Sequence, residues 1–344
     1  MKRLSFWLGL AVPVALLALV IASVDVPAVL GSLRGADPFR VGVAFLLAFL
    51  LPLLLLAWRW RWLLRRFYGI DADYRFILEE YWIALFVGYW VPGGIGSDVY
   101  RAVHVGRRAG GIPANVAVIV GERFWALLVY GVLVLLTYPL VATSLDARPP
   151  VKQAVLQVGT LAALCGVGLC VALLLKDSLG GRLRSAIRGR LMERLSAMAT
   201  ALLRSAAGGD RNVTFSTILT PFFQWRNQAS GLGLMIAIQV ITSVGGRQLL
   251  LALGVDLPLV VHVFVWALMN FFFLLPVAVG GFGVREASFI LLFGLFGVSR
   301  ETSLAASFLT LLCTLTAILP GGLLWLNRGF GRRAAPPEGQ GPEA

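Results

Sequence analysis

The chain has 344 residues, of which 58% are hydrophobic and only 14% are charged. Soluble globular proteins carry about 25% charged residues, so this composition excludes an ordinary soluble fold and places most of the chain in lipid. The net charge is +13, but the basic residues cluster in loops between apolar runs, as the positive-inside rule requires. That distribution argues against a nucleic-acid partner.

Six apolar runs are long enough to span a membrane, since roughly 20 helical residues cross the hydrocarbon core. They are Ser5–Val24, Val41–Trp58, Pro113–Val141, Val151–Leu175, Gly231–Leu253 and Ser303–Leu326. Three further apolar segments are shorter or interrupted, and they fit half-helices or re-entrant segments better: Trp82–Val91, Leu257–Val279 and Ala287–Val298. The sequence therefore predicts an all-α polytopic membrane protein with about six to eight transmembrane helices. The first run also resembles a signal peptide, although its length favours a retained helix.

Two of the interrupted segments break at nearly the same sequence. Residues 92–98 read Pro-Gly-Gly-Ile-Gly-Ser-Asp, and residues 280–286 read Gly-Gly-Phe-Gly-Val-Arg-Glu, so both contain a Gly-Gly-x-Gly core. Glycine-interrupted segments at corresponding places in two halves point to a transporter's binding site, because non-helical backbone at membrane depth must be buried or line a watery cavity. A chance match in a chain with 38 glycines is the alternative. The residues expected to act as hinges are Pro92, Gly93, Gly94, Gly96, Gly280, Gly281 and Gly283.

Loop charges predict the orientation of the helices. Both chain ends, the arginine-containing loop expected at 59–75 and residues 176–211 are rich in basic residues, which predicts that they are cytoplasmic. Three stretches with few basic residues are expected outside: 25–40, 143–150 and 254–258.

This orientation predicts two hairpins that enter the membrane from opposite sides. Residues 77–108 would enter from the cytoplasm and residues 257–300 from outside. With their flanking spans, residues 41–141 and 231–326 would form inverted repeats within a single domain at 1–330, followed by a disordered tail at 331–344.

The connecting segment Leu179–Leu203 has an apolar stripe and an arginine face. Such a pattern describes a helix lying on an anionic membrane surface. A cytoplasmic connector that packs on its own bundle fits the pattern equally well, and the sequence leaves both interpretations open.

Ionisable residues inside the membrane are costly and are therefore functional candidates. Four arginines against three acids leave a net positive interior, and the guanidinium fork matches phosphate. Ser97 and Asp98 are also expected to cap the helix after the first break. The alternative is structural ion pairing, of Asp98 with Arg123 or of Glu286 with Arg247. The candidate substrate-binding residues are Asp98, Arg101, Glu122, Arg123, Arg247, Arg285 and Glu286.

Little in the sequence favours an enzyme. All three cysteines lie in apolar runs, which predicts neither a disulfide framework nor a metal site. The two histidines lack ligand spacing, and no P-loop occurs. The loops hold only scattered acidic pairs, Asp71 with Asp73 and Glu79 with Glu80. We therefore expect no catalytic residue, metal or cofactor.

Three motifs together resemble a known family. They are residues 89–101 (Tyr-Trp-Val-Pro-Gly-Gly-Ile-Gly-Ser-Asp-Val-Tyr-Arg), residues 121–123 (Gly-Glu-Arg) and residues 280–287 (Gly-Gly-Phe-Gly-Val-Arg-Glu-Ala). This pattern resembles the lysylphosphatidylglycerol synthase transmembrane (flippase-like) family over residues 5–330. The resemblance implies a bacterial or archaeal inner-membrane protein that moves anionic or modified phospholipids between leaflets. Some relatives are linked instead to polyprenyl- or dolichyl-linked sugars and to hopanoids.

The resemblance has one departure. Aminoacylating members carry a soluble synthase domain after the membrane region, whereas this sequence ends at Ala344. We therefore expect that it does not aminoacylate lipids by itself.

The leading hypothesis is a lipid flippase that works by alternating access on an anionic or modified phospholipid. The alternative is a membrane subunit or enzyme of lipid-linked glycan synthesis or lipid modification without transport. A subunit could recruit a lipid-modifying enzyme or glycosyltransferase through residues 176–211.

Overall fold

The computed structural model describes residues 22, 24–91, 95–109, 111–144, 225–273 and 283–334, with residues 153, 157 and 160 in isolation. In these ranges every regular element is helical and no strand occurs. Several predictions fall wholly or almost wholly outside them: the spans Ser5–Val24 and Val151–Leu175, the segment 176–211, and the hinge residues Pro92, Gly93, Gly94, Gly280 and Gly281.

Four helices in the described ranges are long and apolar enough to cross a membrane, namely Pro38–Tyr68, Ile112–Val141, Ala229–Ala252 and Arg300–Arg328. They coincide with four of the six predicted runs, which confirms the all-α polytopic fold. The first comprises α3 (Pro38–Ala44), the π-helical η1 (Phe45–Leu50) and α4 (Leu51–Tyr68). The others lie in α7 (Ile112–Val141), α12 (Trp225–Ala252) and α15 (Arg300–Ala334). Because α15 continues to Ala334, it passes the tail boundary expected after residue 330.

Shorter helices lie before and between these spans. They are α2 (Val26–Arg34), α5 (Tyr74–Tyr89), α6 (Ile95–Tyr100), the π-helical η3 (Arg101–Val105), α13 (Leu259–Phe273) and α14 (Val284–Gly294). The local sequence explains where α4 ends and where α5 begins. Gly69 adopts a φ of 67° that terminates α4, and the Asp73 carboxylate accepts a hydrogen bond from the Phe76 N–H to begin α5.

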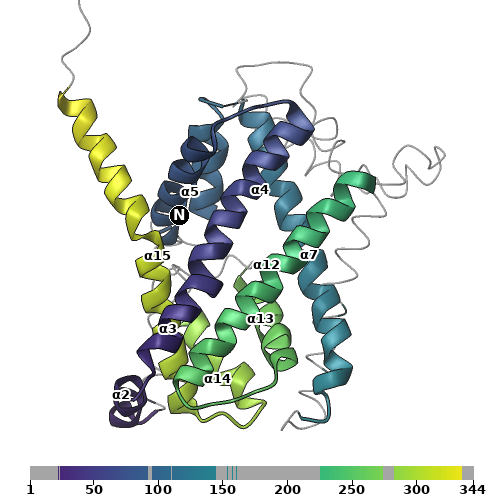
Figure 1. Cartoon of the computed structure of the whole chain (residues 1–344), viewed down its shortest axis with the longest axis vertical. Helices are drawn as coiled ribbons and strands as arrows, with labels where there is room; N and C mark the ends of the chain where they lie inside the picture. Colours follow the sequence, from purple (N-terminus) through teal and green to yellow (C-terminus); the bar gives the residue numbers. More distant parts are fainter. Residues whose placement is uncertain are drawn as a thin grey trace, which may run out of the picture.

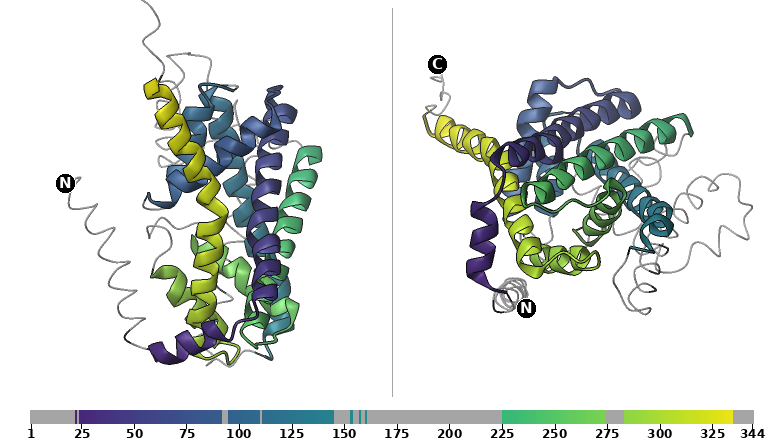
Figure 2. Two further views of the ribbon diagram at one scale, coloured as in Figure 1. Left: turned by 60° about the vertical axis from the view of Figure 1, so that its left-hand side comes forward. Right: turned by 60° about the horizontal axis from the view of Figure 1, so that its bottom comes forward.

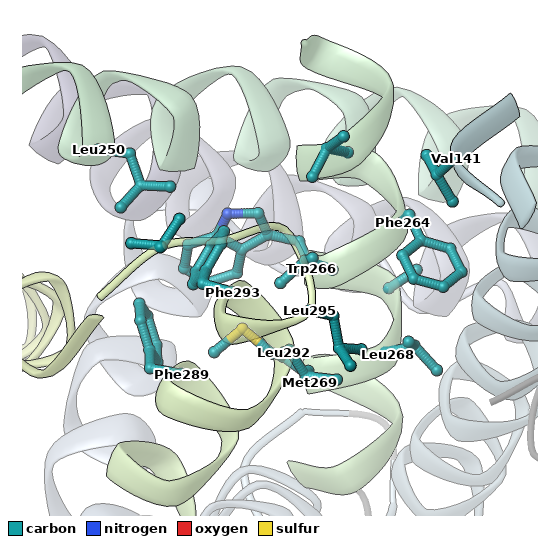
Figure 3. Close-up of a cluster of buried hydrophobic side chains, with 14 of the residues drawn as sticks. Val141, Leu250, Phe264, Trp266, Leu268, Met269, Phe289, Leu292, Phe293 and Leu295 are labelled. Carbon is teal, nitrogen blue, oxygen red and sulfur yellow. The ribbon is translucent and has the colours of Figure 1, made fainter. Parts of the chain in front are cut away.

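Two hydrophobic cores form around the two sets of short helices. The first core joins α4 and α5 to the N-terminal half of α7, and it includes Trp60, Ile77 and Trp125. The second core joins α13 and α14 to the C-terminal end of α7, and Figure 3 shows its aromatic side chains, among them Phe264 and Phe289. The long helix α7 therefore connects two cores at its opposite ends.

The packing between the two halves of the chain is reciprocal. The two most extensive helix contacts are α13 against α7 and α5 against α15. The indole N–H of Trp82 in α5 donates to the Ala317 carbonyl of α15 over 3.0 Å. A Cβ at Gly321 would overlap the Trp82 carbonyl, so only glycine allows this approach. Each half thus packs its first short helix against the last span of the other half.

Several arginines lie together at one end of the molecule. α4 finishes with Arg65 and Arg66, and α15 reaches the same end, where Arg328 contacts Glu79 of α5. α2 packs near the start of α15, where Val29 contacts Leu304 and Ala305. Figures 1 and 2 show that α15 runs from the end where α2 lies to the end where α4 finishes. We call the second of these the arginine-rich end.

Candidate functional site

Four of the predicted site residues meet in one ion cluster beside the first hydrophobic core. Asp98 lies in α6, Arg101 in η3, and Glu122 with Arg123 in α7. Arg59 of α4, which was not among the predicted site residues, completes the cluster. We use the name ion cluster for these five residues, which bring three arginines together with two carboxylates.

Arg101 is the central member of the ion cluster. Its Nη2 donates to Asp98 Oδ1 over 2.8 Å and its Nη1 donates to Glu122 Oε2 over 3.0 Å. The guanidinium carbon also lies 5.2 Å from the Trp60 ring and 5.3 Å from the Tyr81 ring, within cation–π range. The π-helical turn of η3 carries this side chain, and such turns are frequent at functional sites. Arg101 is therefore held on several sides, and only 8% of its side chain is exposed.

Arg123 forms the exposed edge of the ion cluster. Its Nε and Nη2 both donate to Asp98 Oδ2, over 3.1 and 2.7 Å, while 45% of the side chain remains exposed. The ion pair of Asp98 with Arg123 considered from the sequence is thus present. The expected capping by Ser97 and Asp98 is wrong: α6 begins at Ile95, so both residues lie within its first turn. The Asp98 carboxylate instead accepts hydrogen bonds from Arg101 and Arg123.

Arg59 was assigned to a cytoplasmic loop, and this is wrong. α4 continues ten residues beyond the expected end of its run at Trp58, so Arg59 lies inside the helix and is 4% exposed. Its Nη2 lies 3.2 Å from Glu122 Oε1, and its Nη1 contacts the Met235 sulfur at 2.9 Å. The apolar residues Leu63 and Leu64 beyond Arg59 were the available signal that the buried helix continues.

Arg285 and Glu286 form a separate pair, in α14 against α15. The Arg285 guanidinium donates to Glu286 Oε1 and to the Ser307 hydroxyl, the latter over 3.2 Å. Glu286 Oε2 accepts the Gly283 N–H over 2.6 Å and so caps α14. Tyr89 at the end of α5 is close enough to interact with Arg285. Both charged side chains are almost fully buried, and the pair is neutral as a unit.

Arg247 lies apart from both groups. Its Nη2 donates to Asp256 Oδ1 over 2.7 Å and its Nε to the Leu257 carbonyl over 3.1 Å, beyond the end of α12. The considered pair of Arg247 with Glu286 is therefore wrong, because each residue has a partner close to it in sequence. The seven predicted site residues divide into groups of four, two and one.

The two described hinge glycines differ from each other. Gly283 has a φ of 75°, a left-handed angle that only glycine adopts readily, just before α14. Gly96 instead lies in ordinary helical backbone of α6, where a Cβ would overlap Val91 and approach the Gly88 Cα to 3.0 Å. The predicted hinge role implied an unusual backbone angle at Gly96, and this is wrong. This glycine allows α6 to pack closely on α5.

Glu80 was assigned to a loop, but it lies inside α5 and is fully buried. Its Oε1 accepts from Arg328 Nη1 over 2.5 Å and from Arg108 Nη1 over 3.4 Å, and its Oε2 accepts from the Tyr100 hydroxyl over 2.9 Å. Arg328 also binds Glu79 over 3.1 Å. We call these five residues the end network, because they tie α5, α6 and α15 together at the arginine-rich end.

A membrane protein with two helical halves and a buried arginine–carboxylate cluster is the class that this geometry defines. The family model for the lysylphosphatidylglycerol synthase TM region matches residues 6–322, so the chain belongs to this family. Its members are membrane proteins of lipid modification or flipping. Neither a curated protein nor a solved structure matches the chain. In the described ranges, no group of three or more His, Cys, Asp or Glu side chains is placed to hold a metal ion.

Proposed function

We propose that the protein moves a lipid with an anionic headgroup between the leaflets of a bacterial or archaeal cytoplasmic membrane, without enzymatic activity of its own. The observation that carries this proposal is the composition of the ion cluster. Three arginines share two carboxylates, and the excess positive charge lies toward the half-exposed Arg123. An excess of positive charge within a membrane-spanning region is costly, and an anionic phosphate would offset it.

The geometry of Arg123 supports phosphate as the ligand. Asp98 occupies its Nε and Nη2, and both contacts go to one carboxylate oxygen. The remaining guanidinium N–H groups can donate to a phosphate oxygen from the exposed side, since guanidinium offers five donors in one plane. Arg101 is less available, because both carboxylates and two rings already surround it.

The helix packing supports an inverted repeat as the basis of transport. In such a repeat, α4 to α7 would correspond to α12 to α15. Each half packs its first short helix against the last span of the other half, as a pseudo-two-fold axis in the membrane plane would require. α5 lies toward the arginine-rich end, where Tyr100 of α6 joins the end network, whereas the α13–α14 pair lies toward the opposite end (Figure 1). We infer that the two pairs are re-entrant hairpins from opposite faces.

Alternating access follows from this arrangement. The first hairpin would close the arginine-rich face through the end network, and the second hairpin would close the other face. By the positive-inside rule the arginine-rich end would be cytoplasmic, and the sequence predicts the same side for both termini. The headgroup would pass the ion cluster while the acyl chains remain in lipid.

Lipid translocation by the purified protein in liposomes tests this proposal. Wild-type protein should move a fluorescent phosphatidylglycerol analogue faster than protein-free liposomes, and Arg123→Ala should reduce this rate at least tenfold. Arg65→Ala is the matched control, because Arg65 is exposed at the same end and should be dispensable. Wild-type protein that moves no lipid, or Arg123→Ala at the wild-type rate, would contradict the proposal. Wild-type inactivity would favour a non-transporting subunit.

A further inference from the structure

Two amide side chains face each other between α12 and α13. Gln239 is 2% exposed, and its Oε1 accepts from Asn270 Nδ2 over 3.0 Å. The Gln239 Nε2 group is buried and has no hydrogen-bond acceptor in the described ranges. The amide pair therefore holds Gln239 in place but leaves its own donor unused.

Two more buried donors without acceptors lie along α12 on either side of Gln239, one at Gly246 two turns after it and one at Met235 one turn before it. The Nε1 of Trp266, one turn before Asn270 in α13, is buried against Gly246, where a Cβ would collide with the indole. On the other side lies Arg59, whose Nε is also buried without an acceptor among the described residues. Arg59 contacts Met235, which precedes Gln239 by one turn of α12. We call Arg59, Gln239 and Trp266 the donor seam.

A buried donor without an acceptor costs roughly 1–3 kcal/mol, so the neutral donors of Gln239 and Trp266 call for a ligand that supplies acceptors. Arg59 connects the donor seam to the ion cluster, where Glu122 Oε1 lies 3.2 Å from its Nη2. One turn of α12 separates Met235 from Gln239, a rise of about 6 Å. A headgroup whose phosphate is held at the ion cluster would therefore reach Gln239 only with an oxygen that lies beyond the phosphate.

We propose that the donor seam binds the uncharged part of the lipid headgroup, with Gln239 donating to a hydroxyl or carbonyl oxygen beyond the phosphate. This inference rests on the proposed lipid function and adds a selectivity that the ion cluster cannot supply, because arginines recognise phosphate on any phospholipid. Polar residues between membrane helices also act as structural contacts. That role accounts for the bond of Asn270 to Gln239 but leaves the Nε2 donor of Gln239 and the Nε1 donor of Trp266 unexplained.

Competitive binding of two phospholipids to the purified full chain in lipid nanodiscs tests the donor seam. Phosphatidylglycerol carries two hydroxyls beyond its phosphodiester, whereas phosphatidylpropanol has the same charge and chain length without them. Wild-type protein should prefer phosphatidylglycerol about fivefold to tenfold, the effect of one net hydrogen bond. Equal binding of the two lipids would overturn the proposal without any variant.

Gln239→Met should remove the preference by weakening phosphatidylglycerol binding alone. Thr242→Val is the matched control on α12, because the Thr242 hydroxyl donates only to the Ile238 carbonyl of its own helix, and the preference should survive. A Gln239→Met protein that loses affinity for both lipids equally would show a structural role and overturn the proposal. If this variant does not fold, Trp266→Phe, which removes only the indole N–H, should also reduce the preference.

Translocation of the same two lipids separates this inference from the proposed function. A binding preference without translocation would support the donor seam and contradict transport. Translocation of both lipids at equal rates and with equal affinities would support transport and overturn the donor seam.

Discussion

The two Gly-Gly-x-Gly regions of the molecule hold their arginines in different ways. Near the first, three arginines share two carboxylates, and Arg123 remains 45% exposed. Near the second, Arg285 has its own carboxylate in the next residue, and both lie buried beside the aromatic core of Figure 3. The comparison shows that a shared Gly-Gly-x-Gly sequence can stand beside different ion pairs, and we propose that the first region binds a ligand whereas the second holds α14 against α15.

In the inverted repeat that we propose, the helices that would correspond show a similar contrast. Arg59 lies nine residues before the end of α4, and Ser243 lies nine residues before the end of α12. Tyr81 and Trp266 both lie seven residues after the starts of α5 and α13. The first half therefore carries charge where the second carries a hydroxyl. An inverted repeat with unequal halves would give the protein one anionic site and not two.

The largest expected effect on stability comes from Glu286→Ala. It leaves Arg285 buried without a carboxylate and removes the cap of α14, so it should reduce the free energy of unfolding by about 3–5 kcal/mol. Thermal unfolding in detergent measures this loss. The double variant Arg285→Met/Glu286→Gln removes the charge and keeps an acceptor for Gly283, so it should recover most of the stability. A double variant as unstable as the single one would contradict the interpretation that Arg285 and Glu286 act as a structural ion pair.

Glu80→Ala should have the second-largest effect, on the order of 2 kcal/mol, because it leaves Tyr100 and Arg108 without their acceptor and Arg328 with Glu79 alone. The loss is smaller than for Glu286 because Arg108 and Arg328 are partly exposed and can reach water. Glu79→Ala is the control: Glu79 is itself partly exposed and should cost less than about 1 kcal/mol in the same unfolding measurement. Equal losses for both variants would mean that the burial of Glu80 has no energetic consequence.

Arg123→Ala should have the smallest effect on stability, below about 1 kcal/mol, because Asp98 keeps its ion pair with Arg101 and Arg123 is already half-exposed. The same variant should lose transport, whereas Arg285→Ala should lose stability first. Unfolding curves and translocation rates measured on one preparation separate the two effects. If Arg123→Ala unfolds as readily as Glu286→Ala, the first region is structural as well.

Hydropathy predicted the four described spans, because a long apolar segment in lipid must satisfy its backbone hydrogen bonds internally and therefore forms a helix. The ion pair of Asp98 with Arg123 was also among the hypotheses drawn from the sequence. Arg59 and Glu80 were missed, since a charged residue near the end of an apolar run looks like the start of a loop. Their burial depends on partners far away in the chain, Glu122 and Arg328, which spacing along the sequence does not reveal.

The location of the headgroup phosphate tests the central claim most directly. Cryo-electron microscopy of the protein in nanodiscs with an anionic phospholipid would show the phosphate as a strong density feature. The account predicts this density within about 3 Å of the Arg123 guanidinium nitrogens, on the side away from Asp98. A phosphate bound at Arg285 or Arg247, with none at Arg123, would contradict it.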